Sequence, residues 1–110
     1  MPRNAKQPSG AAQPNAGRRP IMALLDLLGR RWTLRVLWEL RDGRSVSFRD
    51  LQERCDGMSS SVLAQRLAEL REAGIVAADG GYALTPEGRD LLEAFEPVYR
   101  WSQRWGRRSA

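Results

Sequence analysis

Apolar residues recur at helical spacing from about residue 20 to residue 73. Pro20 stands where a helix favours its first residue, and a stripe at i, i+3, i+4 and i+7 follows, made of Ile21, Leu24, Leu25 and Leu28. Three further helices are predicted over about 31–41, 48–55 and from Ser59 or Ser60 to Ala73. Their expected inner faces are, in chain order, Leu34, Leu37, Trp38 and Leu40, then Phe48, Leu51 and Cys55, then Leu63, Leu67 and Leu70.

A β-hairpin is predicted next. The apolar runs 75–78 and 82–84 flank Asp79-Gly80-Gly81, and an Asp-Gly pair between such runs favours a tight turn. Residues 45–47 are expected to form no more than a stub of strand. Thr85 and Pro86 are a typical N-cap and first residue of a last helix, whose apolar positions are Leu91, Leu92, Phe95, Val98, Tyr99, Trp101 and Trp105. Pro97 should kink this helix or divide it in two.

This order of elements predicts a mainly α-helical fold with a small β-hairpin, of the α+β class. Two short helices joined by a tight turn that contains glycine, here Asp56-Gly57-Met58, are typical of a helix-turn-helix, and a hairpin directly after them makes it winged. A chain of 110 residues suffices for one domain. We expect this domain at 19–106, after a basic disordered arm at 1–18 and before a basic tail at 107–110.

Composition excludes several classes of site. The chain has no histidine and one cysteine, so it lacks the usual general base, a disulfide framework and a Cys/His metal cluster. It also lacks a phosphate-binding glycine loop. We therefore predict no catalytic residue, metal or cofactor, and no enzyme. Because there is neither a signal peptide nor an apolar run of ~20 residues, we expect a cytoplasmic, nucleoid-associated protein with no membrane partner.

The net charge of +5 is unevenly distributed along the chain. Residues 1–20 and residues 99–110 each carry +4, whereas residues 21–98 hold ten arginines against 13 acids, a net charge of −3. Overall basicity therefore supports an anionic partner only through the two ends. If the middle of the chain binds DNA, it must present a locally basic face.

The helix that starts near Ser59 has the two faces that a major-groove helix needs. Ser61, Gln65 and Ala68 lie opposite its three leucines on a helical wheel. Its first two turns hold Ser59, Ser60, Ser61 and Gln65; glutamine can bond adenine bidentately, and serine can bond a base or a phosphate. Arg66 on the flank and Arg31 and Arg49 at other helix starts are candidate phosphate contacts. The alternative is an ordinary solvated helix surface.

Aromatic residues and the lone cysteine have two interpretations each. Phe95, Tyr99, Trp101 and Trp105, with Trp32 and Trp38, are expected at a dimer interface, although a pocket for an unknown small-molecule effector is the alternative. Cys55 shares a stripe with Phe48 and Leu51, which favours packing over redox chemistry. Arg54 beside it leaves a lowered thiol pKa as the alternative.

The segment from Leu24 to about Trp105 resembles the HxlR family of bacterial and archaeal winged-helix regulators. The motifs that carry the resemblance are Leu27-Leu28-Gly29-Arg30-Arg31-Trp32-Thr33, Phe48-Arg49-Asp50-Leu51, the run from Gly57 to Val76 with its Ser-x-x-x-Leu-x-x-Arg-Leu-x-x-Leu core, and Tyr82-Ala83-Leu84-Thr85-Pro86-Glu87-Gly88. The resemblance implies double-stranded DNA as partner and a homodimer formed by the first and last helices. We accordingly expect Leu24, Leu25 and Leu28 at the interface with Phe95, Tyr99, Trp101 and Trp105.

The resemblance also implies transcriptional repression, less often activation, at palindromic sites near promoters. The chain departs from the family in two places. Arg19-Pro20 stands where many members carry Cys-Pro, which excludes a thiol switch there, and the short wing has Asp79 at its tip and no Arg or Lys between Ile75 and Leu84. The rival hypothesis is a winged-helix protein-interaction module that does not bind DNA.

Overall fold

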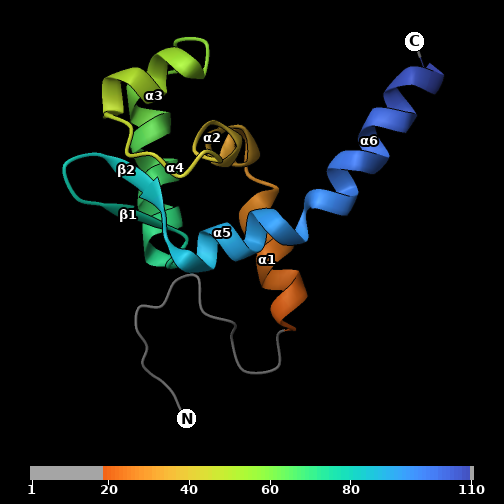
Figure 1. Ribbon diagram of the computed structural model, residues 1–110. Helices are drawn as coiled ribbons and strands as arrows, with labels where there is room; N and C mark the ends of the chain where they lie inside the picture. Colours follow the sequence, from red (N-terminus) through yellow and green to blue (C-terminus); the bar gives the residue numbers. More distant parts are fainter. Residues whose placement is uncertain (1–18, 110) are drawn as a thin grey trace.

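The structure is a computed structural model that describes residues 19–109. Its elements are α1 (Pro20–Leu28), α2 (Thr33–Glu39), α3 (Phe48–Arg54), α4 (Ser60–Glu72), β1 (Val76–Ala78), β2 (Tyr82–Leu84), α5 (Pro86–Ala94) and α6 (Glu96–Ser109), as Figure 1 shows. The predicted winged helix-turn-helix is confirmed. The predicted arm at 1–18 lies outside the described residues, and residues 107–109 continue α6 where a tail was expected.

Side-chain caps fix where three of the helices begin. The Ser47 hydroxyl accepts a hydrogen bond from the Asp50 amide at 3.1 Å, and the Ser59 hydroxyl accepts one from the Val62 amide at 3.3 Å. Thr85 does the same for the amide of Gly88 at 3.0 Å. Each cap satisfies one of the amides that a helix start leaves without a partner. The predicted N-cap at Thr85 is confirmed, and α3 and α4 begin where helices were predicted, at residue 48 and directly after Ser59.

The wing is a two-stranded antiparallel hairpin. Val76 pairs with Leu84 and Ala78 with Tyr82, and the turn between them uses Gly80 at φ 70°. Val46, in the predicted stub, bridges Tyr82 through two backbone hydrogen bonds of 2.9 and 2.7 Å. This third segment ties the hairpin to the start of α3, so the wing is anchored at its base.

The core lies between α2, α3, α4 and the hairpin. Its fully enclosed side chains include Val36, Leu37, Leu51, Leu63 and Leu70. Gly88 in α5 packs against the backbone of Ile75 so closely that a Cβ would overlap the Ile75 carbonyl. That contact holds α5 against the residue that precedes β1. A glycine is needed there because any side chain would separate the two segments.

The predicted inner face of α2 was wrong in two positions. Leu34 and Trp38 are 47% and 40% exposed, and Val36 occupies the core in their place. α2 begins at Thr33, directly after the left-handed Trp32 (φ 78°), and its buried stripe follows the i, i+3, i+4, i+7 spacing as Thr33, Val36, Leu37 and Leu40. Two stripes of this short helix carry apolar residues at helical spacing, and tertiary packing selects the one that is buried.

The C-terminal segment divides near Pro97, as predicted. α5 ends at Ala94, Phe95 caps it, and α6 starts at Glu96 with Pro97 in its first turn, where a missing amide costs little. α6 then projects away from the rest of the molecule (Figure 1), and none of residues 96–108 is buried. No helix among the described residues is both long and apolar enough to cross a membrane.

Candidate nucleic-acid interface

α4 presents the polar face that the sequence predicted. Leu63, Leu67 and Leu70 are at most 2% exposed and anchor the helix in the core, whereas Ser60, Ser61 and Gln65 are exposed on the other side. The turn before α4 reverses the chain through two left-handed residues, Asp56 (φ 61°) and Gly57 (φ 68°). The helix-turn-helix therefore holds α4 by its leucines and leaves its first turns accessible.

The three serines at the start of α4 have different roles. Ser59 caps the helix, and its Oγ lies 2.9 Å from the Oγ of Ser61 in a hydrogen bond between the two hydroxyls. A hydroxyl has one donor and two acceptor sites, so this pair retains capacity for an outside group. Ser60 is exposed beside them. The group can thus offer short, preorganised hydrogen-bonding side chains to a base edge or a phosphate.

The side chain of Arg66 is not free to make the phosphate contact that the sequence predicted. Its side chain is only 12% exposed; Nε donates to the carbonyl of Arg31 at 2.9 Å and NH1 donates to Glu69 Oε1 at 2.7 Å. Glu69 also lies 3.7 Å from Arg30 Nε. The expectation of a phosphate contact at Arg66 is corrected, because this side chain joins α4 to the loop between α1 and α2.

The other two predicted phosphate contacts are accessible. The Arg49 side chain is 88% exposed, and its nearest carboxylate is Glu53, at 3.9 Å. Arg31 is exposed, and its guanidinium stands 5.9 Å from the centre of the Trp32 ring. The long ion pair of Arg49 contributes little between exposed groups, and the contact of Arg31 with the Trp32 ring is weak at an exposed site. Both arginines can therefore turn toward an anion at small cost.

Sequence reasoning missed Arg35, which holds the turn of the helix-turn-helix. This α2 side chain donates to the Arg54 carbonyl at 2.6 Å and to Asp56 Oδ2 at 3.1 Å. Its Nε also donates to Glu39 Oε2 at 2.9 Å, and that hydrogen bond raises the pKa of Arg35. The contacts span 19 and 21 residues of chain. Only the i,i+4 spacing with Glu39 was visible in the sequence.

Large apolar side chains are exposed along one set of helices. They are Ile21, Met22 and Leu25 of α1, Leu34 and Trp38 of α2, and Val98, Tyr99, Trp101 and Trp105 of α6. Of the predicted interface residues, Leu24 and Phe95 are half-buried against the core, and Leu28 is buried in it at 6% exposure. Leu28 thus packs within its own chain, and Ile21 and Met22 extend the exposed face instead.

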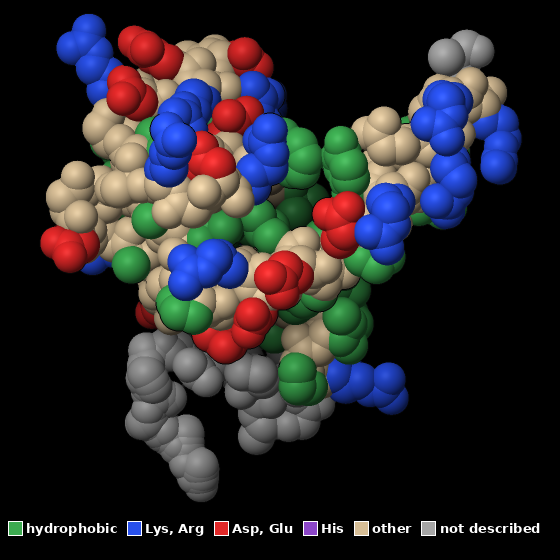
Figure 2. All heavy atoms as spheres, viewed as in Figure 1, with side chains coloured by type: hydrophobic (Ala, Val, Ile, Leu, Met, Phe, Trp, Pro, Cys, Tyr) green, Lys and Arg blue, Asp and Glu red, His purple; other side chains and the backbone are tan. Residues whose placement is uncertain are grey.

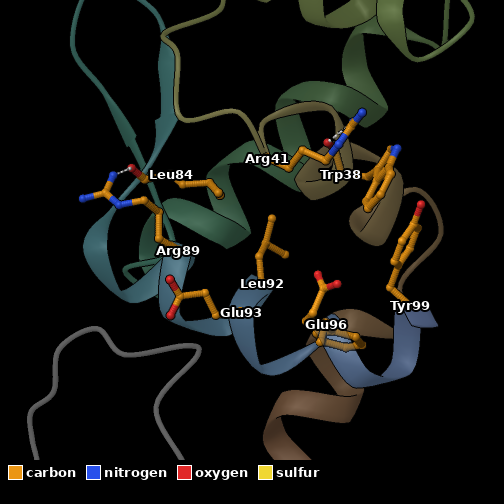
Figure 3. A pocket seen from close by; sticks show the side chains of 9 residues that line it. Trp38, Arg41, Leu84, Arg89, Leu92, Glu93, Glu96 and Tyr99 are labelled. Carbon is orange, nitrogen blue, oxygen red and sulfur yellow. Dashed lines mark hydrogen bonds between the residues drawn. The ribbon is translucent and has the colours of Figure 1, made fainter. Parts of the chain in front are cut away.

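Two adjoining cavities lie beneath α6. Both are lined by Trp38, Leu92, Phe95 and Tyr99, and the rings of Trp38 and Tyr99 stack with centres 5.3 Å apart. The apolar cavity, about 360 Å³, lies on the side of Leu34 and Val98. The charged cavity, about 490 Å³, is bounded by β2 and by Arg41, Arg89, Glu93 and Glu96 (Figure 3). The aromatic residues could be predicted from the sequence, but their division between two cavities could not.

Cys55 is fully buried at the end of α3. Its apolar surroundings disfavour the thiolate, so burial raises the pKa of the thiol. A thiol with these properties is a packing group and not a reactive one. The interpretation of Cys55 as a core residue is confirmed.

Comparison with known proteins agrees with this architecture. Residues 27–110 match the family described as HxlR-like helix-turn-helix. The uncharacterized HTH-type transcriptional regulator MJ0925 of Methanocaldococcus jannaschii is 33% identical, over 76% of this chain and 83% of that protein. Quinone-bound YodB from Bacillus subtilis superposes with a TM-score of 0.70 at 30% identity, covering 76% of this chain and 96% of YodB. A possible HxlR family transcriptional factor from Thermoplasma volcanium gives 0.68 at 26% identity, over 81% and 86%.

Proposed function

Since the chain belongs to the HxlR-like helix-turn-helix family and is a DNA-binding transcriptional regulator, we propose that it acts as a homodimeric repressor at palindromic operators. The observation that carries the proposal is the exposed polar face of α4, held out by three buried leucines. A helix of this kind can enter the major groove with its N-terminal turns against the base edges. Its site of action is then chromosomal DNA in the cytoplasm.

The roles of the side chains follow from their geometry. Gln65 on the exposed face reads adenine through its amide, and Ser60 and Ser61 bond a neighbouring base or phosphate. Arg49 and Arg31, both accessible, hold phosphates on either side of the groove and fix the register of the protein. Arg66 is left out of this surface because its guanidinium is already engaged within the chain.

The exposed apolar faces of α1 and α6 support the dimer. Trp101 and Trp105 are 53% and 54% exposed and stack on each other with ring centres 5.8 Å apart. Aromatic side chains in such numbers are typical of interface cores, and the apolar cavity beside Leu34 and Val98 can receive them from a second copy. A two-fold arrangement would set the two α4 helices about 34 Å apart, one turn of DNA.

The rival is a protein-interaction module, which the net charge of −3 over residues 21–98 favours. Selection of bound sequences from a random duplex pool, with the full chain at near-physiological salt, separates the two. We expect a palindromic motif with half-sites about one helical turn apart, and binding that weakens steeply as salt is raised. A folded dimer that enriches no sequence would overturn the operator proposal.

A further inference from the structure

We infer that the charged cavity between α2, β2, α5 and α6 is an effector site for a small planar aromatic carboxylate that also carries a hydrogen-bond donor. The cavity, about 490 Å³, falls within the size range of small-molecule sites. It is separate from the α4 face, so its existence does not depend on the proposed operator. Only its regulatory consequence rests on the proposed function.

The walls suit a flat ring. Leu84, Leu92 and Phe95 supply apolar surface, and Trp38 and Tyr99 stand at one end with their rings inclined by only 25° to each other (Figure 3). Trp38 and Tyr99 are 40% and 41% exposed, so substantial aromatic surface remains in contact with solvent. A ligand ring packed there would remove that surface from water and gain the preference of aromatic groups for one another.

The charges indicate which polar groups the ligand carries. Arg41 lies 4.0 Å from the centre of the Trp38 ring and donates through NH1 to the Trp38 carbonyl at 3.0 Å. Arg89 donates through NH1 to the Leu84 carbonyl at 3.4 Å. Neither arginine has a carboxylate partner among residues 19–109. Their remaining N–H groups can therefore donate hydrogen bonds to an anion, and a planar carboxylate matches the guanidinium fork.

The opposite rim indicates the donor. In Figure 3 the Glu96 carboxylate points up into the cavity, between Leu92 and Tyr99. Glu96 also pairs with Arg100 at 3.3 Å, which offsets part of its charge. Oxygens of a carboxylate accept hydrogen bonds only, so the ligand needs a hydroxyl or amine facing Glu96 while its own carboxylate faces Arg41.

The position of the cavity links it to the DNA-binding turn. Trp38 and Arg41 border the cavity from α2 and the stretch just after it, and α2 also carries Arg35, whose guanidinium holds Arg54 and Asp56 before α4. Tyr99 and Glu96 belong to α6, which the proposed dimer uses. A ligand that fixes the distance between Trp38 and Tyr99 would thus constrain α6 relative to the helix-turn-helix.

The test uses 6-hydroxy-2-naphthoate as the probe, titrated into the full-length protein by calorimetry without DNA. Replacing its carboxylate by an amide should weaken binding at least about tenfold, and removing its hydroxyl about fivefold. Arg41→Gln should match the amide effect, Arg41→Lys should restore part of the affinity, and Arg44→Gln, an exposed arginine outside the cavity, should change nothing. The assignment would be overturned if Arg41→Gln left the affinity for the probe unchanged. It would also be overturned if a naphthylmethylammonium analogue bound more tightly than the probe.

The regulatory consequence has its own measurement. Operator duplex should change the probe's affinity by the same factor, at least about fivefold, by which saturating probe changes the affinity for that duplex. If the probe binds but neither ligand changes the affinity for the other, the effector role is rejected, although the cavity remains a binding site. If no duplex is ever bound but Arg41-dependent probe binding persists, the operator proposal fails and the site stands.

Discussion

α4 and α6 are amphipathic helices of nearly equal length, 13 and 14 residues, but within the protomer only α4 buries its apolar side chains. α4 buries Leu63, Leu67 and Leu70 in the core of its own chain. α6 buries none of residues 96–108, and Trp101 and Trp105 remain more than half exposed along an arm that leaves the body (Figures 1 and 2). An apolar stripe therefore shows that a helix needs a partner, but not which chain supplies it.

The polar faces differ as sharply as the apolar ones. The first two turns of α4 expose serines and a glutamine, which can distinguish bases. On α6 the exposed cations gather in a row that Figure 2 shows along the arm, made of Arg100, Arg104, Arg107 and Arg108. The proposed base reading therefore belongs to α4, whose exposed groups are short and neutral, whereas α6 carries a row of long cations.

The largest effect is expected in the core beneath α4. Leu63→Ala should lower the free energy of unfolding by about 2–5 kcal/mol, because it leaves a cavity in a fully enclosed site. Urea unfolding at low protein concentration measures it. The same substitution at Leu25, which is 52% exposed, is the matched control and should cost much less. Equal losses of stability at the two positions would contradict the distinction between the enclosed core beneath α4 and the exposed apolar side of α1.

The second prediction concerns the exposed stripe of α6. Trp105→Ala should weaken dimerisation by about 2 kcal/mol, roughly 30-fold in the dissociation constant, while the circular dichroism of the diluted protein stays unchanged. Gln103→Ala, on another side of the same helix, is the control. Sedimentation equilibrium gives both constants. A dimer that tolerates Trp105→Ala would place the two-fold contact elsewhere.

On the α4 side, we expect two substitutions to separate base reading from phosphate binding. Gln65→Ala should cost about 1–3 kcal/mol on the selected operator and relax the preference at one base pair. Arg49→Ala should weaken binding to all sequences alike and reduce the salt slope by about 0.9. Binding isotherms at several salt concentrations, on operator and scrambled duplexes, test both. Identical behaviour of the two variants would refute these roles.

The smallest predicted effect lies at Cys55. Because burial raises its thiol pKa above the ordinary value of 9.0, the unfolded chain releases this proton at lower pH than the folded one. Stability should therefore fall as pH rises above about 9 and until the folded thiol also ionises. Urea unfolding at about pH 7 and about pH 10 should show a larger loss for the natural chain than for Cys55→Ala. Equal losses would mean that the thiol is solvated.

The elements that could be predicted are those decided within a few residues. Ser47, Ser59 and Thr85 each cap an amide three positions on, and Asp79-Gly80-Gly81 makes its turn locally. The register of α2 could not be predicted in this way. Two of its stripes carry apolar residues, and only packing selects the one that is buried. The left-handed backbone of Trp32 before it is equally non-local, because a bulky residue adopts that conformation only when the surrounding packing compensates for its strain.

That α4 has one buried and one polar face follows from its residues alone, because a helical period of 3.6 residues places its three leucines on the same side. The roles of the arginines, by contrast, depend on how the elements pack together. Arg66 and Arg35 look like their exposed neighbours in the sequence, yet each bonds partners 19–35 residues away. Arg66, a predicted phosphate contact, is thereby engaged within its own chain. The charged cavity likewise draws on α2, β2, α5 and α6 at once. Such sites depend on distances between elements, which local periodicity does not encode.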